Sequence, residues 1–115
     1  MAKERINKIN EEVMRELAVI IRELKDARIP LITSVISVNV TNDLSYAKAY
    51  ISVLGDEKVQ KDAIAGLKSA SGYIRREIGH RLKLRHTPEF IFELDHSIEH
   101  GSKITQMLRD INKEG

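Results

Sequence analysis

The segment from Leu67 to Pro88 limits the possible folds of this chain more than any other. Its apolar side chains recur every three or four residues, as on the buried face of an amphipathic helix. The members of this stripe are Ile64, Leu67, Ala70, Ile74, Ile78 and Leu82. The pair Ser71-Gly72 lies inside the stripe, so we expect the helix to kink or break there. The segment is therefore predicted to form two helices joined at small residues.

A long helix and a β-hairpin are predicted before this segment. Residues 4–27 have the apolar spacing of an amphipathic helix, which we expect to end before Pro30 because the residue that precedes a proline avoids the helical region. From residue 31 to 41, and again from 46 to 53, the period changes to two, as in half-buried strands. The inner face of the first strand would carry Ile36, Val38 and Val40. The short connection between the two strands predicts an antiparallel hairpin.

Two helices, a third strand and a last helix are predicted after the hairpin. Asp56 can cap a helix over residues 57–71, and a further helix is expected over 73–84. The alternation over 90–94 predicts a strand, and a right-handed crossover through the two helices would make it parallel to the second strand. A short helix is expected over 102–111. Its core-facing side chains would be Ile104, Met107, Leu108 and Ile111.

The chain is therefore expected to form one α+β domain over residues 1–115. The predicted order is α-β-β-α-(kink)-α-β with a short C-terminal helix and a three-stranded mixed sheet. No apolar run approaches the ~20 residues of a membrane span, and the charged N-terminus lacks the apolar core of a signal peptide. The chain has no cysteine, which excludes disulfides and thiolate chemistry. These features predict a cytoplasmic protein with no membrane partner.

The net charge of +2 hides an uneven distribution of charge. Residues 66–88 hold six cations and one acid, whereas residues 89–100 hold four acids and no lysine or arginine. At about 100° per residue, the cations of the helical part fall away from the apolar stripe. Such local asymmetry indicates an anionic partner at this region. The alternative is an ordinary solvated helix face.

The helix joint could bind a nucleic-acid backbone. Gly72 has no Cβ, so a sugar-phosphate chain could approach it closely, and backbone N–H groups at the start of the second helix would favour an anion. Cations on either side of the joint would add affinity that depends on salt and little on sequence. The predicted RNA-binding residues are Lys68, Ser71, Gly72, Arg75, Arg76, Arg81, Lys83, Arg85 and His86. The alternative reading is that Gly72 only allows tight helix packing and that Ala70 belongs to the core.

Catalytic motifs are lacking, so we expect a binding module with no catalytic residue, metal site or cofactor. His96 and His100 are four residues apart, but the H-E-x-x-H pattern of a zinc helix is absent. The chain also has no G-x-S-x-G motif and no phosphate-binding glycine loop. A metal-dependent nuclease that uses the two histidines is the weakest alternative.

A set of short motifs extends along the chain, and they are specific in their order and spacing. The motifs are Lys25-Asp26-Ala27-Arg28, Asp43-Leu44-Ser45-Tyr46-Ala47-Lys48, Val53-Leu54-Gly55-Asp56, Ala70-Ser71-Gly72-Tyr73-Ile74-Arg75, Leu84-Arg85-His86-Thr87-Pro88, Phe92-Glu93-Leu94-Asp95 and Ser97-Ile98. In these motifs the chain resembles the ribosome-binding factor A family of bacterial small-subunit assembly factors, and the likeness extends from about Arg5 to Ile111.

The resemblance implies a type II KH-like domain in which the kink Ala70-Ser71-Gly72 replaces the usual GxxG loop. It also implies a monomer that binds free 30S subunits but not 70S ribosomes. The expected contact is with 16S rRNA near its 5′-terminal helix, in support of late 30S maturation and 16S rRNA processing, most of all in the cold. The alternative function is a protein–protein adaptor without direct RNA contact, which would dock a protein on the outer hairpin face at Tyr46, Lys48 and Tyr50.

Overall fold

The structure, a computed structural model, describes residues 3–30 and 32–95. The elements are α1 (Lys3–Glu23), β1 (Thr33–Val40), β2 (Tyr46–Val53), α2 (Glu57–Ser69), α3 (Ser71–Arg81) and β3 (Glu89–Leu94). This order confirms the expected α-β-β-α-α-β arrangement. The helix predicted over 102–111, with Ile104, Met107, Leu108 and Ile111, lies outside the described residues.

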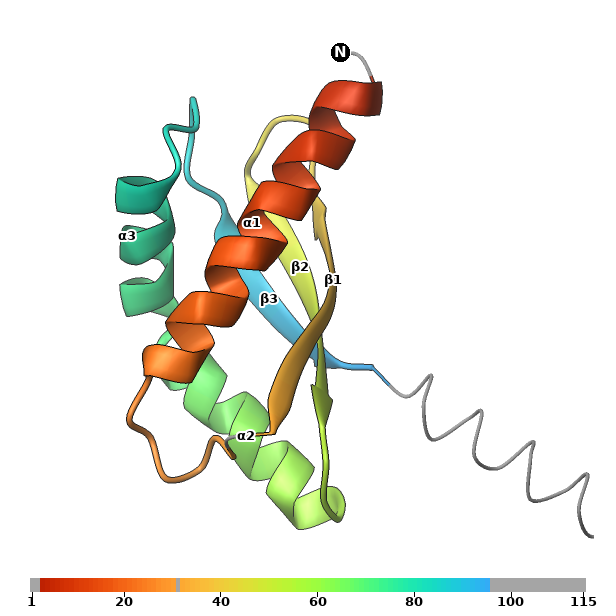
Figure 1. Ribbon diagram of the computed structural model, residues 1–115, viewed down its shortest axis with the longest axis vertical. Helices are drawn as coiled ribbons and strands as arrows, with labels where there is room; N and C mark the ends of the chain where they lie inside the picture. The colour runs from red at the N-terminus through yellow and green to blue at the C-terminus, as the bar shows by residue number, and fades with distance from the viewer. Residues whose placement is uncertain (1–2, 31, 96–115) are drawn as a thin grey trace, which may run out of the picture.

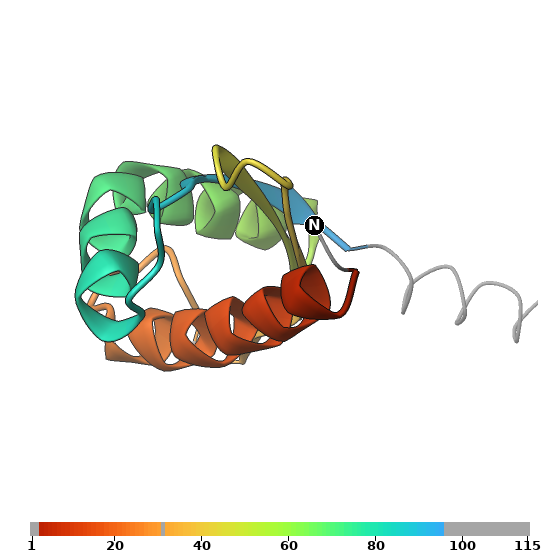
Figure 2. The ribbon, with the colours of Figure 1, turned by 90° about the horizontal axis from the view of Figure 1, so that it is seen from above.

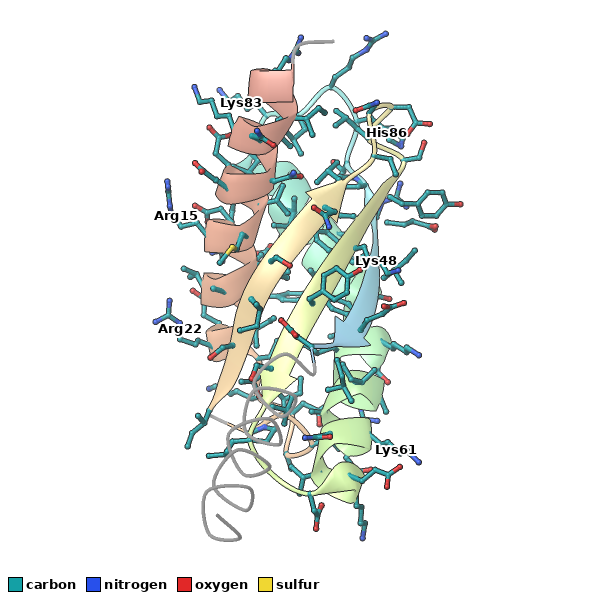
Figure 3. The ribbon with its side chains drawn as sticks, turned by 90° about the vertical axis from the view of Figure 1, so that its right-hand side faces the viewer. Arg15, Arg22, Lys48, Lys61, Lys83 and His86 are labelled. Atoms are coloured by element: carbon teal, nitrogen blue, oxygen red, sulfur yellow. The ribbon has the colours of Figure 1, made fainter. Side chains whose placement is uncertain are left out.

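The three strands form a mixed sheet in the order β1-β2-β3. β1 pairs antiparallel with β2, and β3 pairs parallel with β2, so both predicted strand directions are confirmed. The three described helices lie on one side of the sheet (Figure 1, Figure 2). The opposite side, the bare sheet face, is covered by no helix of residues 3–30 and 32–95, and it faces the viewer in Figure 3.

The core lies between the sheet and the helices. Leu67, Ile74 and Ile78 of the predicted apolar stripe are fully buried there. Each of the other helices and strands also contributes buried side chains, among them Leu17 of α1 and Phe92 of β3. The stripe therefore continues from α2 into α3, as predicted, and it holds the two helices against the sheet.

The predicted inner face of β1 is wrong at Ile36. Val35 pairs with Ile51 and Ser37 pairs with Tyr50, so Ile36 is an extra residue in a β-bulge. The extra residue shifts the alternation, and Val35 is buried in its place while Ile36 is exposed. Val38 and Val40 are buried as predicted.

The first helix ends earlier than predicted, at Glu23 instead of residue 27. The Asp26 carboxylate accepts a hydrogen bond from the Arg28 backbone N–H at 2.9 Å, and Ile29 N–H donates to the Asp26 carbonyl at 3.0 Å. An aspartate that binds its own backbone in this way favours a turn over a helix. The turn thus begins well before Pro30.

The joint between α2 and α3 also lies slightly earlier than predicted. Ala70 separates the helices, and its N–H still bonds back to the carbonyls of Gly66 and Leu67. Ser71 and Gly72 therefore belong to the first turn of α3, although we expected Ser71 to end the preceding helix and Gly72 to lie between the helices. The helices predicted over 57–71 and 73–84 end instead at Ser69 and Arg81. Asp56 caps α2 as predicted, because its side chain accepts from the Val59 N–H at 2.9 Å.

Candidate nucleic-acid interface

The first turn of α3 is open to a ligand at Gly72. A Cβ added to Gly72 would meet no atom within 4 Å. Ala70, at the helix start, provides no side-chain cap for the first N–H groups of α3. Tight packing therefore does not explain this glycine, and the exposed helix terminus can accept an anion.

Gly66 is the glycine that packing requires in this region. A Cβ there would lie 2.9 Å from Ile29 Cγ1, in the segment that connects α1 with β1. Sequence reasoning missed this role, because a glycine inside a helical pattern does not reveal which segment crosses it. Ala70 itself is partly buried against the core, which agrees with the alternative reading for this residue.

The open turn lies beside a surface cavity of about 290 Å³. Ser71, Gly72 and Arg75 line it from α3, and Glu89, Phe90 and Ile91 line it from β3. The structure thus brings three predicted site residues together against an edge strand. The β3 residues of this cavity were not predicted as site residues, although the expected parallel pairing placed their strand near the crossover helices.

Arg75 is held in place beside this cavity. Its Nε donates a hydrogen bond to the Thr87 carbonyl oxygen at 3.2 Å. Among the described residues this is the side chain's one hydrogen bond, and it forms no ion pair there. The guanidinium therefore keeps donors for an anion while its direction is fixed.

Four other predicted cations and His86 surround the joint or follow α3. Lys68, Arg76, Lys83, Arg85 and His86 are all exposed. None of the five forms an ion pair within residues 3–30 and 32–95. Lys68 lies at the end of α2, and Arg76 follows Arg75 on α3. Lys83 and His86 lie at the end of the molecule where the β1–β2 turn also lies (Figure 3).

Arg81 differs from the other predicted cations. Its guanidinium lies 2.9 Å from Glu23, 3.2 Å from Glu77 and 3.7 Å from Glu16. The hydrogen bond with Glu23 is the largest of the causes that raise its pKa above the ordinary value. Arg81 therefore joins α3 to α1, and we leave it out of the interface that we propose.

The bare sheet face carries the residues of the predicted protein-binding alternative. Tyr46 and Ile91 are 47% and 43% exposed. Lys48 Nζ lies 5.7 Å from the centre of the Tyr50 ring and 3.3 Å from Glu93. Its charge is thus partly engaged within the sheet, and this face is more neutral than the joint.

The described residues contain no group of three or more His, Cys, Asp or Glu side chains that could hold a metal ion. His96 and His100 lie outside that part of the chain. No described helix is both long and apolar enough to cross a membrane.

Comparisons with known proteins agree on one family. The family model described as ribosome-binding factor A matches residues 5–108. A ribosome-binding factor A of Clostridium tetani is 54% identical over 114 residues, which cover 98% of this chain and 94% of the relative. A ribosome-binding factor A of Caldanaerobacter subterraneus is 50% identical over 111 residues, which cover 96% of this chain and 91% of the relative.

Solved structures with the same names share the fold. A Thermotoga maritima protein described as a putative ribosome binding factor A has a TM-score of 0.72 at 26% identity, over 81% of this chain and 89% of its own. The crystal structure of the Thermus thermophilus ribosome-binding factor A also has a TM-score of 0.72, at 22% identity, over 80% of this chain and 97% of its own. Coordinates of the latter factor fitted into a cryo-EM map of a 30S–RBFA complex give 0.64 at 24% identity, over 76% of this chain and 91% of that one.

Proposed function

Because this chain belongs to the ribosome-binding factor A family, we propose that it binds the 30S ribosomal subunit through 16S rRNA at the α2–α3 joint. The observation that most supports this RNA contact is the open turn at Gly72 beside the cavity that Arg75 lines. The 30S–RBFA complex of the Thermus thermophilus factor supports the choice of partner.

The chemistry of the joint suits a phosphate. The uncapped start of α3 carries the positive end of the helix dipole, and the missing Cβ at Gly72 leaves room for an RNA backbone. Arg75 offers guanidinium donors at the edge of the cavity. Lys68 and Arg76 add charges that have no carboxylate partner in the described part of the chain. Such contacts position a backbone without reading its sequence.

The more detailed role that we propose for this chain is based on its resemblance to the family. We propose a non-catalytic factor, one domain over residues 1–115 and monomeric, that prefers free 30S subunits to 70S ribosomes. It would contact 16S rRNA near the 5′-terminal helix, support 16S rRNA processing, and matter most during growth in the cold. On this proposal it acts in the cytoplasm, as the 30S subunit does, and the joint takes the place of the GxxG loop of a type II KH-like domain.

A second candidate is the protein adaptor. It is favoured by the exposed aromatic and apolar side chains of the bare sheet face, Tyr46 and Ile91. On that alternative the chain would reach the subunit through a ribosomal protein, and the cations at the joint would only be solvated.

Sedimentation with purified 30S subunits and 70S ribosomes separates the two candidates. RNA binding at the joint predicts comigration with 30S that weakens steeply as salt rises, because each phosphate contact releases counterions. A Tyr46→Ala variant should then bind like the wild type. Binding that resists salt and is lost in Tyr46→Ala would establish the adaptor and overturn the joint.

A further inference from the structure

A second cavity lies at the end of the molecule where the β1–β2 turn meets the α3–β3 loop. It has a volume of about 220 Å³. Arg5 of α1, Asn42 of the turn, and Arg85 with His86 of the loop form its polar walls. Ile9 and Leu44, both buried, line its apolar part. The predicted interface included Arg85 and His86 but neither Arg5 nor Asn42.

The walls of this cavity are mainly cationic. Arg5 and Arg85 form no ion pair within the described chain. Asp43 also lines the cavity, but its Oδ1 accepts hydrogen bonds from the Ser45 N–H at 3.0 Å and from the Thr41 hydroxyl at 2.8 Å. The one acid therefore stabilises the turn, and two arginines outnumber it.

The apolar part is held by a strained residue. Leu44 has a φ of +61°, in the left-handed region, and its side chain is only 5% exposed. Bulky residues rarely adopt this region, and such backbone strain clusters at ligand sites. The turn thus directs an apolar side chain into the molecule at the point where the cations converge.

We propose that this cavity binds one unstacked RNA nucleotide. The base would contact Ile9 and Leu44, with the His86 ring available for stacking and the Asn42 amide for the base edge. Arg5 and Arg85 would hold the phosphate. The proposal rests on the proposed function, and it extends the RNA contact from the joint, along α3, to the loop that precedes β3.

Nuclear magnetic resonance on the full chain tests the proposal with mononucleotides. The labelled protein is titrated with adenosine 5′-monophosphate, uridine 5′-monophosphate and inorganic phosphate at equal ionic strength. We expect saturable shifts of the Leu44, Arg5 and His86 signals with a nucleotide and much smaller ones with phosphate. Equal shifts with phosphate would mean an adventitious anion site and overturn the nucleotide proposal, as would unchanged Leu44 and His86 signals.

A matched pair of variants adds a second readout. Arg5→Gln should weaken nucleotide binding by roughly three- to tenfold, as expected for the loss of one partly exposed charge-assisted hydrogen bond. Arg15→Gln makes the same change on the outer face of the same helix (Figure 3) and should leave binding unchanged. Equal effects of the two would overturn the site.

The titration needs no ribosome, so nucleotide binding at the cavity and the proposed function are tested separately. If the protein comigrates with 30S but its signals do not shift with a nucleotide, only the nucleotide proposal is overturned. If the wild type does not bind 30S, the proposed function is overturned, and the titration still tests nucleotide binding at the cavity.

Discussion

Arg75 Nε on α3 donates a hydrogen bond to the carbonyl oxygen of Thr87, at 3.2 Å, in the loop that leads into β3. Thr87 also packs closely on α3, since a Cβ at Gly79 would lie 3.0 Å from its hydroxyl oxygen. These contacts fix the direction of the Arg75 side chain at the edge of the Gly72 cavity. Arg75 is thus both a structural and a candidate binding residue, whereas its exposed neighbour Arg76 is not tied to any described carboxylate.

Gly72→Ala should separate stability from binding. The added methyl group meets no atom in the protein, and alanine is the better helix former, so the variant should be more stable by about 0.5 kcal/mol. The same methyl group would obstruct an RNA backbone, so 30S binding should weaken. Denaturant unfolding and sedimentation measure the two effects. A variant that binds as tightly as the wild type would remove Gly72 from the interface.

Arg81→Ala should lower the stability of the protein and leave its binding to 30S unchanged, the opposite of Gly72→Ala. The substitution removes the partner of Glu16, Glu23 and Glu77 and leaves three acids near one another. The melting temperature should fall, whereas salt-dependent binding to 30S should persist below that temperature. Thermal melts and sedimentation in the cold test this. Loss of binding by a fully folded Arg81→Ala protein would return Arg81 to the interface.

Asp43 should contribute to stability in a narrow acid window. Hydrogen bonds from the Ser45 backbone and side chain and from Thr41 lower its pKa from 3.8 to about 2. A depressed folded pKa means that the contribution is complete above about pH 4 and is lost as the pH falls towards about 2. Asp26 behaves alike, because hydrogen bonds from Arg28 lower its pKa to about 2.

Unfolding measured at several values between pH 5 and pH 2 checks this expectation. Asp43→Asn keeps a side chain that can form the turn but removes the titration, so its stability should fall less steeply with acid than that of the wild type. Identical slopes for Asp43→Asn and the wild type would contradict the assignment.

Much of the fold could be predicted from the sequence because periodicity reports burial. The stripe through Leu67, Ile74 and Ile78 located both crossover helices, and the change of period located the strands. The bulge at Ile36 and the early end of α1 at Glu23, before the Asp26 turn, could not be predicted in this way, because each depends on a local hydrogen-bond pattern that overrides the period.

The candidate site could be predicted only in part. Charge and the small residues of the joint indicated Gly72, Arg75 and Arg76, all of which lie on the first two turns of α3. The ion pairs of Arg81 with α1 could not be predicted, because its partners Glu16 and Glu23 are far away in the sequence. Arg5 and Asn42 were missed for the same reason, since only the folded chain brings them to the Arg85 loop.

The most direct test of the account compares Arg76→Glu with Lys58→Glu. Both residues are exposed and free of ion pairs within the described chain, and both substitutions change the net charge equally. Arg76 follows the joint, whereas Lys58 lies at the opposite end of α2. Sedimentation with purified 30S subunits at low and moderate salt should show binding lost or reduced at least about tenfold by Arg76→Glu, with a smaller salt slope, and retained by Lys58→Glu. Equal binding by the two folded variants would contradict an RNA interface at the α2–α3 joint.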